Sequence, residues 1–216
     1  MVPPFPFDDV KKVVETSLKS TLSEKFRTFN ETPCASASIA QVHHAILHDG
    51  QDVAVKIKRP GIDKIIESDI SVMYAIAKLI DRYVPALKRY RPQEIVDEFK
   101  RIIVKEQDFT VEGVNVTRFY KMFEGDKTVQ VPKVFWEYTS ADVLTLERIY
   151  GTPLDETDKI IQQGLDVKKI AEDALNAFFK QVFEFGVFHA DLHPGNIFVR
   201  NDGVIIYLDF GIVGRI

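Results

Sequence analysis

Residues 189–196 read His-Ala-Asp-Leu-His-Pro-Gly-Asn, residues 209–211 read Asp-Phe-Gly, and far upstream residues 53–56 read Val-Ala-Val-Lys. Phosphoryl transfer requires a cation on the phosphate oxygens, side chains that hold a metal ion, and a carboxylate near the attacking oxygen. The three stretches supply a lysine, two carboxylates and an amide. The sequence therefore predicts a phosphoryl-transfer site.

The order of these stretches along the chain matches the protein-kinase signature. A lysine strand comes first, an Asp and an Asn separated by four residues come next, and Asp-Phe-Gly follows. Each stretch alone is a weak indication, whereas the ordered set is specific.

Composition limits the kind of partner. The net charge of −4 gives no overall attraction for nucleic acid, so a local cluster must bind any anionic ligand. The single cysteine, Cys34, excludes an intrachain disulfide and a cysteine-built metal site, and it fits a reducing compartment. No apolar run approaches the roughly 20 residues that span a bilayer, and the proline-rich start lacks the order of a signal peptide. We expect a soluble, cytoplasmic chain.

Periodicity predicts the elements of the first half. A helix is expected from Asp8 to Leu22, and strands 44–47 and 52–58 form a hairpin around Asp49-Gly50. Long helices are expected over 62–84 and 92–123. The second begins at Pro92 and carries an apolar stripe of Ile95, Phe99, Ile102 and Ile103.

The second half is predicted to bring two metal ligands together. Strands 133–138 and 143–149 complete a small antiparallel sheet, and a helix capped by Asp166 runs to Phe185. A turn at 201–203 joins strands 197–199 and 204–208. Asn196 precedes the first of these strands and Asp209 follows the second, so their side chains are expected to converge.

The β-rich part ends near residues 151–153, where we place a boundary between lobes. Residues 1–150 then form an N-terminal lobe, and residues 151–216 form part of a C-terminal lobe. The chain ends five residues after Gly211, so we expect the second lobe to be truncated before its activation segment.

Lys56 is the candidate phosphate-binding cation. Because side chains alternate along a strand, Lys56 can face a cleft while the valines beside it pack in the core. The alternative is a solvated lysine, which is the usual case for a single lysine on a strand. A carboxylate must fix this lysine, and the helix 92–123 offers Glu106, Asp108 and Glu112. We choose Glu112, although periodicity alone does not separate it from Glu106.

Asp191 is the candidate catalytic base, because a carboxylate near an attacking oxygen can accept its proton. Asn196 and Asp209 are candidate Mg²⁺ ligands, since magnesium favours oxygen donors. His189 and His193 with Asp191 suggest zinc as an alternative, but a further ligand set is missing. Bracing of the loop by these histidines is the preferred interpretation.

The chain resembles the UbiB/ADCK (ABC1-type) family of atypical protein-kinase-like proteins. Besides the motifs above, the resemblance rests on residues 35–43, Ala-Ser-Ala-Ser-Ile-Ala-Gln-Val-His, and 106–108, Glu-Gln-Asp, and it covers nearly the whole chain. It implies an α+β, bilobal protein-kinase-like fold with a small antiparallel sheet and long helices in the N-lobe. Alanines and serines replace the kinase glycines, which narrows the backbone conformations of the loop.

The resemblance also implies roles for individual residues. Lys56 would contact the α- and β-phosphates and pair with Glu112, Asp191 would be the catalytic aspartate, and Asn196 and Asp209 would ligate magnesium. Glu106 and Asp108 would form the family's acidic motif. The remaining implied nucleotide contacts are those of the loop and of the hinge at 146–149: Ala35, Ser36, Ala37, Ser38, Glu147 and Ile149.

By resemblance, the chain is expected to be an ATP- or ADP-binding, Mg²⁺-dependent atypical kinase or ATPase supporting ubiquinone or related isoprenoid-lipid biosynthesis. The alternatives are a small-molecule phosphotransferase of the aminoglycoside or choline kinase type and a non-catalytic nucleotide-sensing scaffold. Relatives carry a Lys-x-Gly-Gln helix upstream and, in many bacteria, C-terminal hydrophobic helices, so the chain is expected to be truncated at both ends. Expected partners are isoprenoid lipid, quinone-biosynthesis proteins and, for the full-length parent, a membrane. The basic run at 88–91 is expected to be a solvated helix end or, alternatively, a membrane or partner contact.

Overall fold

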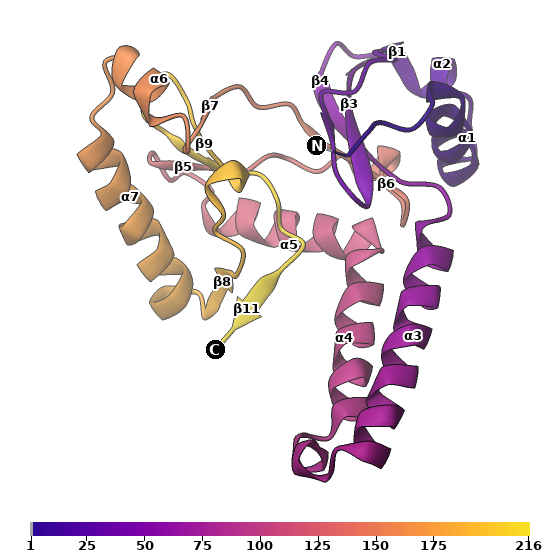
Figure 1. The fold of residues 1–216 in the computed structure, drawn as a ribbon. Helices are drawn as coiled ribbons and strands as arrows, with labels where there is room; N and C mark the ends of the chain where they lie inside the picture. The colour runs from indigo at the N-terminus through magenta and orange to yellow at the C-terminus, as the bar shows by residue number, and fades with distance from the viewer. Residues whose placement is uncertain (1) are drawn as a thin grey trace.

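An antiparallel sheet forms the first half of the computed structural model, which describes residues 2–216 (Figure 1). The hairpin predicted around Asp49-Gly50 is confirmed, and Gly50 adopts the positive φ of +90° that its turn requires. The main strand order is β1-β3-β4-β6, and β2 adds to β3. These strands are β1 (Phe26–Phe29), β2 (Ala35–Ser36), β3 (Ala40–Leu47), β4 (Asp52–Lys58) and β6 (Val143–Glu147).

Two short helices, α1 (Phe7–Leu18) and α2 (Leu22–Lys25), pack against this sheet. Val10 and Val14 of α1 are fully buried against the valines of β4. The predicted single helix over residues 8–22 is wrong, because Lys19 turns left-handed at φ +52° and a Thr21–Glu24 capping box starts a new helix.

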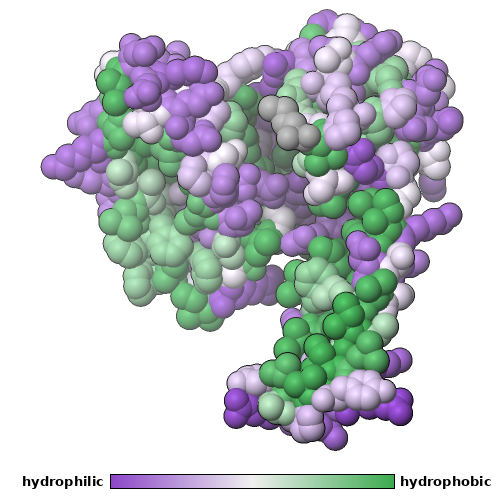
Figure 2. Space-filling view, in the orientation of Figure 1, coloured by the Kyte–Doolittle hydropathy of each residue, from purple (hydrophilic) through white to green (hydrophobic). Residues whose placement is uncertain are grey.

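A helical hairpin projects away from the two sheets (Figure 1). It consists of α3 (Ile62–Tyr83), the 3₁₀ turn η1 (Pro85–Tyr90) and α4 (Pro92–Glu106). The stripe predicted on α4 is confirmed as a packed face only at Ile103, which joins the buried Val96 against α3. The other three residues of the stripe are exposed: Ile95 (58%), Phe99 and Ile102. One partner helix covers only a narrow band of α4, so the rest of its apolar surface is exposed (Figure 2).

Helix α5 (Phe109–Met122) runs between the two halves of the molecule (Figure 1). The predicted continuous helix 92–123 is wrong, because it breaks at Gln107–Asp108. The Asp108 carboxylate accepts the Thr110 N–H at 2.9 Å and thereby caps a new helix. An aspartate side chain can accept hydrogen bonds from nearby backbone N–H groups and so end one helix and start another. Apolar periodicity carries no sign of such a cap.

A second sheet has the order β5-β10-β9-β7. The hairpin predicted across residues 201–203 is confirmed as antiparallel β9 and β10, while β5, from before the predicted lobe boundary, pairs with β10 in parallel. The predicted strand 133–138 is wrong: Val134 makes one bridge, and a 3₁₀ turn, η2 (Trp136–Tyr138), follows. The strands are β5 (Val129–Gln130), β7 (Thr152–Pro153), β9 (Ile197–Val199) and β10 (Ile205–Tyr207).

Helices cover the second sheet. The predicted helix capped by Asp166 is confirmed as α7 (Val167–Phe179), with a π-helical continuation, η3 (Lys180–Glu184), that ends before Gly186 at φ +63°. The other elements here are α6 (Thr157–Gln162), β8 (Val187–His189), η4 (Pro194–Asn196) and β11 (Val213–Arg215). Together they position the loop between β8 and β9 at the edge facing α5.

Candidate active site

Two carboxylates, those of Glu112 and Asp209, lie close to the Lys56 ammonium. Lys56 Nζ lies 3.0 and 2.8 Å from the two Glu112 oxygens and 3.5 Å from Asp209 Oδ2. The side chains of Lys56 and Glu112 are 19% and 7% exposed. Burial acts to lower the pKa of Lys56, but the charges of Glu112 and Asp209 outweigh it and leave that pKa raised. The lysine is therefore held as a cation.

Local sequence explains why these groups meet. Burial alternates along β4, so Val55 and Ile57 face the core and Lys56 faces the cleft, as predicted. Glu112 stands in the first turn of α5, where a helix favours negative charge. The Phe109 ring, one turn earlier, lies 5.3 Å from Nζ. The structure thus pairs Lys56 with Glu112 and not with Glu106.

The Asp-Phe-Gly stretch is anchored through its middle residue. Phe210 is fully buried, with its ring 4.9 Å from that of Phe119, and its carbonyl accepts the Asn115 side chain at 3.0 Å. Asp209 Oδ1 accepts the Gly211 N–H at 3.0 Å. Burial raises the pKa of Asp209, but the Lys56 ammonium and the Gly211 N–H outweigh it, so that pKa is below its ordinary value. Asp209 is therefore an anion at neutral pH.

Histidines brace the loop that carries Asp191. His189 Nδ1 accepts the Asp191 N–H at 3.2 Å, and His193 Nδ1 accepts the Gly195 N–H at 3.1 Å. His189 is almost fully buried, which lowers its pKa. The bracing role predicted for both histidines is confirmed by these bonds, which leave the Asp191 carboxylate in the open cleft.

The donor set near Asp191 fits a magnesium ion. Asn196 Nδ2 donates to Asp191 Oδ2 at 3.1 Å, and the Asn196 side-chain amide oxygen makes no hydrogen bond among the described residues. Within residues 2–216, no group of three His, Cys, Asp or Glu side chains is arranged to hold a metal ion. Magnesium needs only one or two protein oxygens, together with phosphate and water. Asn196 and Asp209 supply that number.

The two residues of the acidic motif lie in different environments. Burial and the charges of Asp209 and Asp191 raise the pKa of Glu106 and outweigh the Lys56 ammonium, which lowers it. This group of carboxylates makes the region attractive to a divalent cation. Asp108, by contrast, caps α5, and its carboxylate accepts the Thr110 N–H.

The Ala-Ser loop connects β2 to β3 at the edge of the sheet. Ala35 and Ser36 pair with β3, and the Ala37 N–H donates to the Ala40 carbonyl at 2.8 Å. Ala37 and Ser38 are exposed at the turn. Contact between these four residues and nucleotide stays a prediction.

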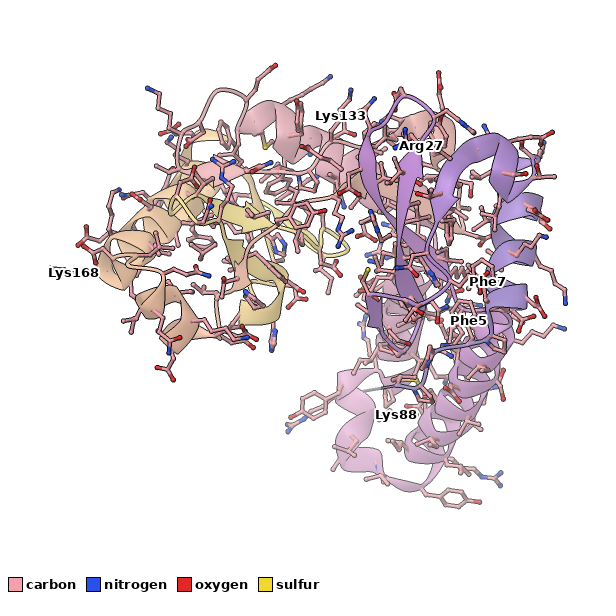
Figure 3. All side chains as sticks on the ribbon, turned by 90° about the horizontal axis from the view of Figure 1, so that it is seen from above. Phe5, Phe7, Arg27, Lys88, Lys133 and Lys168 are labelled. Atoms are coloured by element: carbon pink, nitrogen blue, oxygen red, sulfur yellow. The ribbon has the colours of Figure 1, made fainter. Side chains whose placement is uncertain are left out.

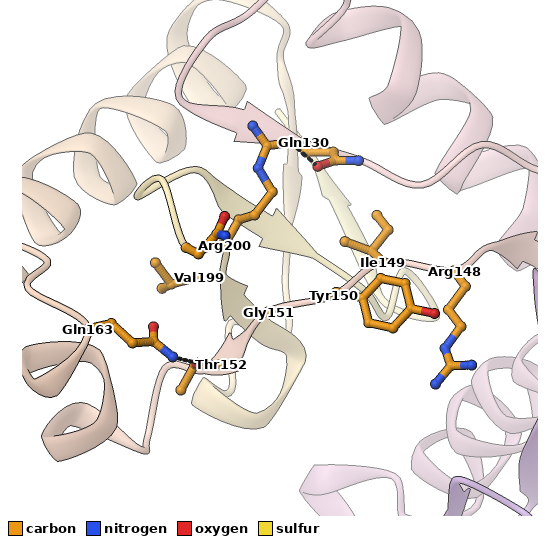
Figure 4. Close-up of a pocket in the computed structure, with 10 residues that line it drawn as sticks. Gln130, Arg148, Ile149, Tyr150, Gly151, Thr152, Gln163, Val199 and Arg200 are labelled. Carbon is orange, nitrogen blue, oxygen red and sulfur yellow. Dashed lines mark hydrogen bonds between the residues drawn. The ribbon is translucent and has the colours of Figure 1, made fainter. Parts of the chain in front are cut away.

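The predicted hinge leads from the first sheet to the second: Glu147 ends β6, and Ile149 follows it. The Glu147 N–H donates to the Lys133 carbonyl at 2.8 Å, so it is not free to meet an adenine. Ile149 lines a pocket of about 540 Å³ between residues 148–152 and the end of β9 (Figure 4). Neither Asn196 nor Asp209 lines this pocket. The adenine contacts of Glu147 and Ile149 stay predictions.

Two polar residues near the site were not identified from the sequence. Asn115 holds the Phe210 carbonyl, and Gln181 is fully buried with its Oε1 accepting the His189 N–H at 2.9 Å. Asn115 lies three positions after Glu112 on α5, a spacing that indicates a shared helix face. Gln181 lies four positions after the buried Ala177, a spacing that places a polar side chain on the inward face of the helix.

Relatives with the same organisation are known. The sequence profile of the ABC1 atypical kinase-like domain matches residues 1–216. Proteins named probable protein kinase UbiB from Cellvibrio japonicus and Marinobacter nauticus are 42% and 41% identical over 219 residues, covering all of this chain. The chain spans about 40% of the length of these relatives.

A solved structure shares the fold. Rv3197 from Mycobacterium tuberculosis, determined as a complex with erythromycin, has a TM-score of 0.82 and 34% identity over 99% of this chain and 53% of its own. The predicted α+β, bilobal kinase-like architecture is confirmed by this match. The chain belongs to the ABC1 family of atypical kinase-like domains, whose curated relatives named here are called UbiB.

Proposed function

We propose that this domain binds ATP or ADP with Mg²⁺ and acts as an atypical kinase or ATPase. The proposal rests on three charged side chains that come from distant parts of the chain and lie close together. Lys56 of β4 and Glu112 of α5 form a buried ion pair, and Asp209 lies 3.5 Å from the same lysine. Asp191 and Asn196 stand on the adjoining loop.

The chemistry follows from this arrangement. Lys56 would hold phosphate oxygens, and Asn196 and Asp209 would hold the metal ion, which neutralises charge on the phosphates when bound. Asp191 would accept the proton of the attacking hydroxyl or water as the new oxygen–phosphorus bond forms and the bond to the leaving nucleotide breaks. The Ala-Ser loop supports an atypical rather than an ordinary protein kinase, because alanine Cβ atoms restrict the approach of the loop to phosphate.

Phosphate release from ATP tests the proposal. We expect Mg²⁺-dependent turnover that falls by about 10²–10⁴-fold in Asp191→Asn, the range for removal of a general base. A small alcohol that accelerates ADP formation and becomes phosphorylated would favour the phosphotransferase alternative. Nucleotide binding with no turnover in the wild type would support the scaffold and contradict the enzyme.

We also propose that the parent protein serves ubiquinone or related isoprenoid-lipid biosynthesis and contacts a membrane through the α3–α4 hairpin. Large apolar side chains are exposed along it, including Leu79 at 56% and Ile95 at 58% (Figure 2). Four basic and two acidic side chains line a surface pocket near its tip: Lys78, Arg82, Lys88, Arg91, Asp81 and Glu94. Arg91 pairs with Glu94 at 3.2 Å, so the excess of basic groups rests on the other three. Apolar and basic groups together favour an anionic lipid surface. Among the described residues, no helix meets the length and hydropathy needed to cross a bilayer.

Vesicle co-sedimentation tests the membrane contact. Vesicles containing anionic phospholipid are expected to retain the wild-type chain, and Leu79→Ser with Ile95→Ser is expected to weaken retention. Equal retention by neutral and anionic vesicles, or no effect of the double substitution, would contradict this proposal.

A further inference from the structure

Arg59 makes an unusual number of contacts with the backbone of the Ala-Ser loop. It directly follows β4, and its own N–H donates to the Ile39 carbonyl at 2.8 Å. Its Nε donates to the Ser38 carbonyl at 3.0 Å, and its Nη2 donates to the Ala37 carbonyl at 3.1 Å. The same Nη2 lies 3.5 Å from Ser36 Oγ. One side chain thus contacts three successive residues of the loop.

These bonds fix the direction of two peptide groups. Because the peptide bond is planar and trans, its N–H points opposite to its carbonyl. The Ala37 and Ser38 carbonyls point at Arg59, so the N–H groups of Ser38 and Ile39 point away from it. Across residues 2–216, neither N–H has an acceptor. Successive free N–H groups on one side of a loop are suited to an anion.

The same guanidinium ties the N-terminal segment to the loop. Its Nη2 lies 3.1 Å from the Pro3 carbonyl, and its carbon lies 5.2 Å from the centre of the Phe5 ring. The Phe5 N–H donates to Gln41 Oε1 at 3.0 Å, which fastens this segment to β3, the strand that leaves the loop. Phe5 lies next to the strands where the chain enters α1 (Figure 3). The N-terminal segment therefore contacts Arg59, and Arg59 in turn contacts the loop.

We propose that Arg59 is a positioning residue that presents the N–H groups of Ser38 and Ile39 to the phosphates of the bound nucleotide. A loop without glycine has fewer backbone conformations available, and Arg59 selects one of them. Because Nε and Nη2 donate to loop carbonyls, the proposed role of Arg59 is exerted through the backbone of the loop. The proposal rests on the nucleotide site proposed above.

The test compares ligands with and without phosphate. By calorimetry with Mg²⁺, Arg59→Gln should weaken ADP and ATP binding by roughly tenfold or more, the loss of one or two charge-assisted hydrogen bonds. Adenosine affinity should change by less than about twofold, as for a contact that is left intact. Arg59→Lys should rescue only partly, because an ammonium lacks the planar fork. Unchanged ADP affinity, or an equal loss for adenosine and ADP, would overturn the proposal.

Two further variants keep the test interpretable. Arg27→Gln removes an exposed arginine from β1 and should leave all affinities unchanged. Phe5→Leu keeps every Arg59 hydrogen bond but removes the aromatic ring beside the guanidinium. It should weaken ADP binding less than Arg59→Gln does. If the Arg59→Gln chain does not fold, Phe5→Leu takes its place in the test. Hydrogen exchange of the Ala37 amide separates this inference from the proposed function, because it needs no nucleotide. This amide donates to the Ala40 carbonyl at 2.8 Å within the loop. Faster exchange of the Ala37 amide in Arg59→Gln supports the clamp, and unchanged exchange contradicts it.

Discussion

The two sides of the cleft differ in how completely their charged groups are paired. On the β4 side, Lys56 and Glu112 are buried and share two short contacts. On the loop side, Asp191 is exposed and Asn196 is half-buried, and the Asn196 side-chain amide donates to the Asp191 carboxylate. Asp209 lies between, with its side chain 45% exposed and one oxygen near Lys56.

This difference separates charged groups that stabilise the fold from charged groups that serve only to bind a ligand. A buried ion pair that loses one member leaves an unpaired charge in a poorly solvated place, so it destabilises the fold. Replacing an exposed carboxylate changes the free energy of unfolding little, because water replaces its contacts. We therefore expect the β4 side to carry stability as well as function, and the loop side to carry function alone.

Glu112→Leu should have the largest effect on stability. It leaves the Lys56 ammonium without its closest carboxylates, and we expect the free energy of unfolding to fall by about 3–5 kcal/mol in urea titrations. Lys56→Met combined with Glu112→Leu should recover most of this loss, because no buried charge remains unpaired. A fall below about 1 kcal/mol for Glu112→Leu, as for a surface pair, would contradict the comparison.

Glu98→Gln provides the matched control for this prediction. Its pair with Arg101 on α4 is exposed on both sides, at 54% and 66%. An exposed helix pair of this kind contributes about 0.5 kcal/mol or less. The same urea titration should therefore show almost no change.

Asp126→Asn should have an intermediate effect. Burial raises the pKa of Asp126, but its 2.7 Å contact with Lys180 and the Thr128 N–H outweigh it and lower the pKa from 3.8 to about 2. At about 1.4 kcal/mol per pKa unit, this carboxylate contributes roughly 2 kcal/mol. Because the folded pKa is depressed, the contribution is present above pH 4 and is lost as pH falls toward 2. Urea titrations at pH 3 and 6 should show a smaller wild-type-to-variant difference at the lower pH; an equal difference would contradict this.

Asn196→Ala should have the smallest effect on stability. Its side chain donates to Asp191 in an exposed loop, so we expect the free energy of unfolding to change by less than about 0.5 kcal/mol. The magnesium concentration required for half-maximal ADP binding should rise, because an oxygen ligand is lost. Unchanged magnesium dependence in a calorimetric titration would remove Asn196 from the metal site.

Short-range patterns were sufficient for much of the fold and the site. Alternation in β4 correctly turned Lys56 to the cleft, and the Gly-containing turns correctly located both hairpins. Each of these features depends on residues a few positions apart. Periodicity and turn chemistry report directly on such contacts.

Competing and long-range contacts were not predictable in the same way. The apolar periodicity over 92–123 was real, but the cap at Asp108 divided it into two helices. The stripe with Ile95 has the apolar pattern of a buried helix face. Whether such a face is buried depends on which other elements pack on it, and this cannot be predicted from the spacing within α4. Arg59 contacts a loop about twenty residues earlier, and no local spacing marks such a partner.

Thermal unfolding with Mg²⁺ and ADP tests the central claim, that the two lobes bind a magnesium nucleotide between Lys56 and Asp209. ADP at about 100 times its dissociation constant should stabilise the wild type by roughly 2.7 kcal/mol. Asp209→Asn should fold but lose the magnesium-dependent part of this gain. A wild-type transition that ignores ADP, or a variant that retains the full magnesium-dependent gain, would contradict the account.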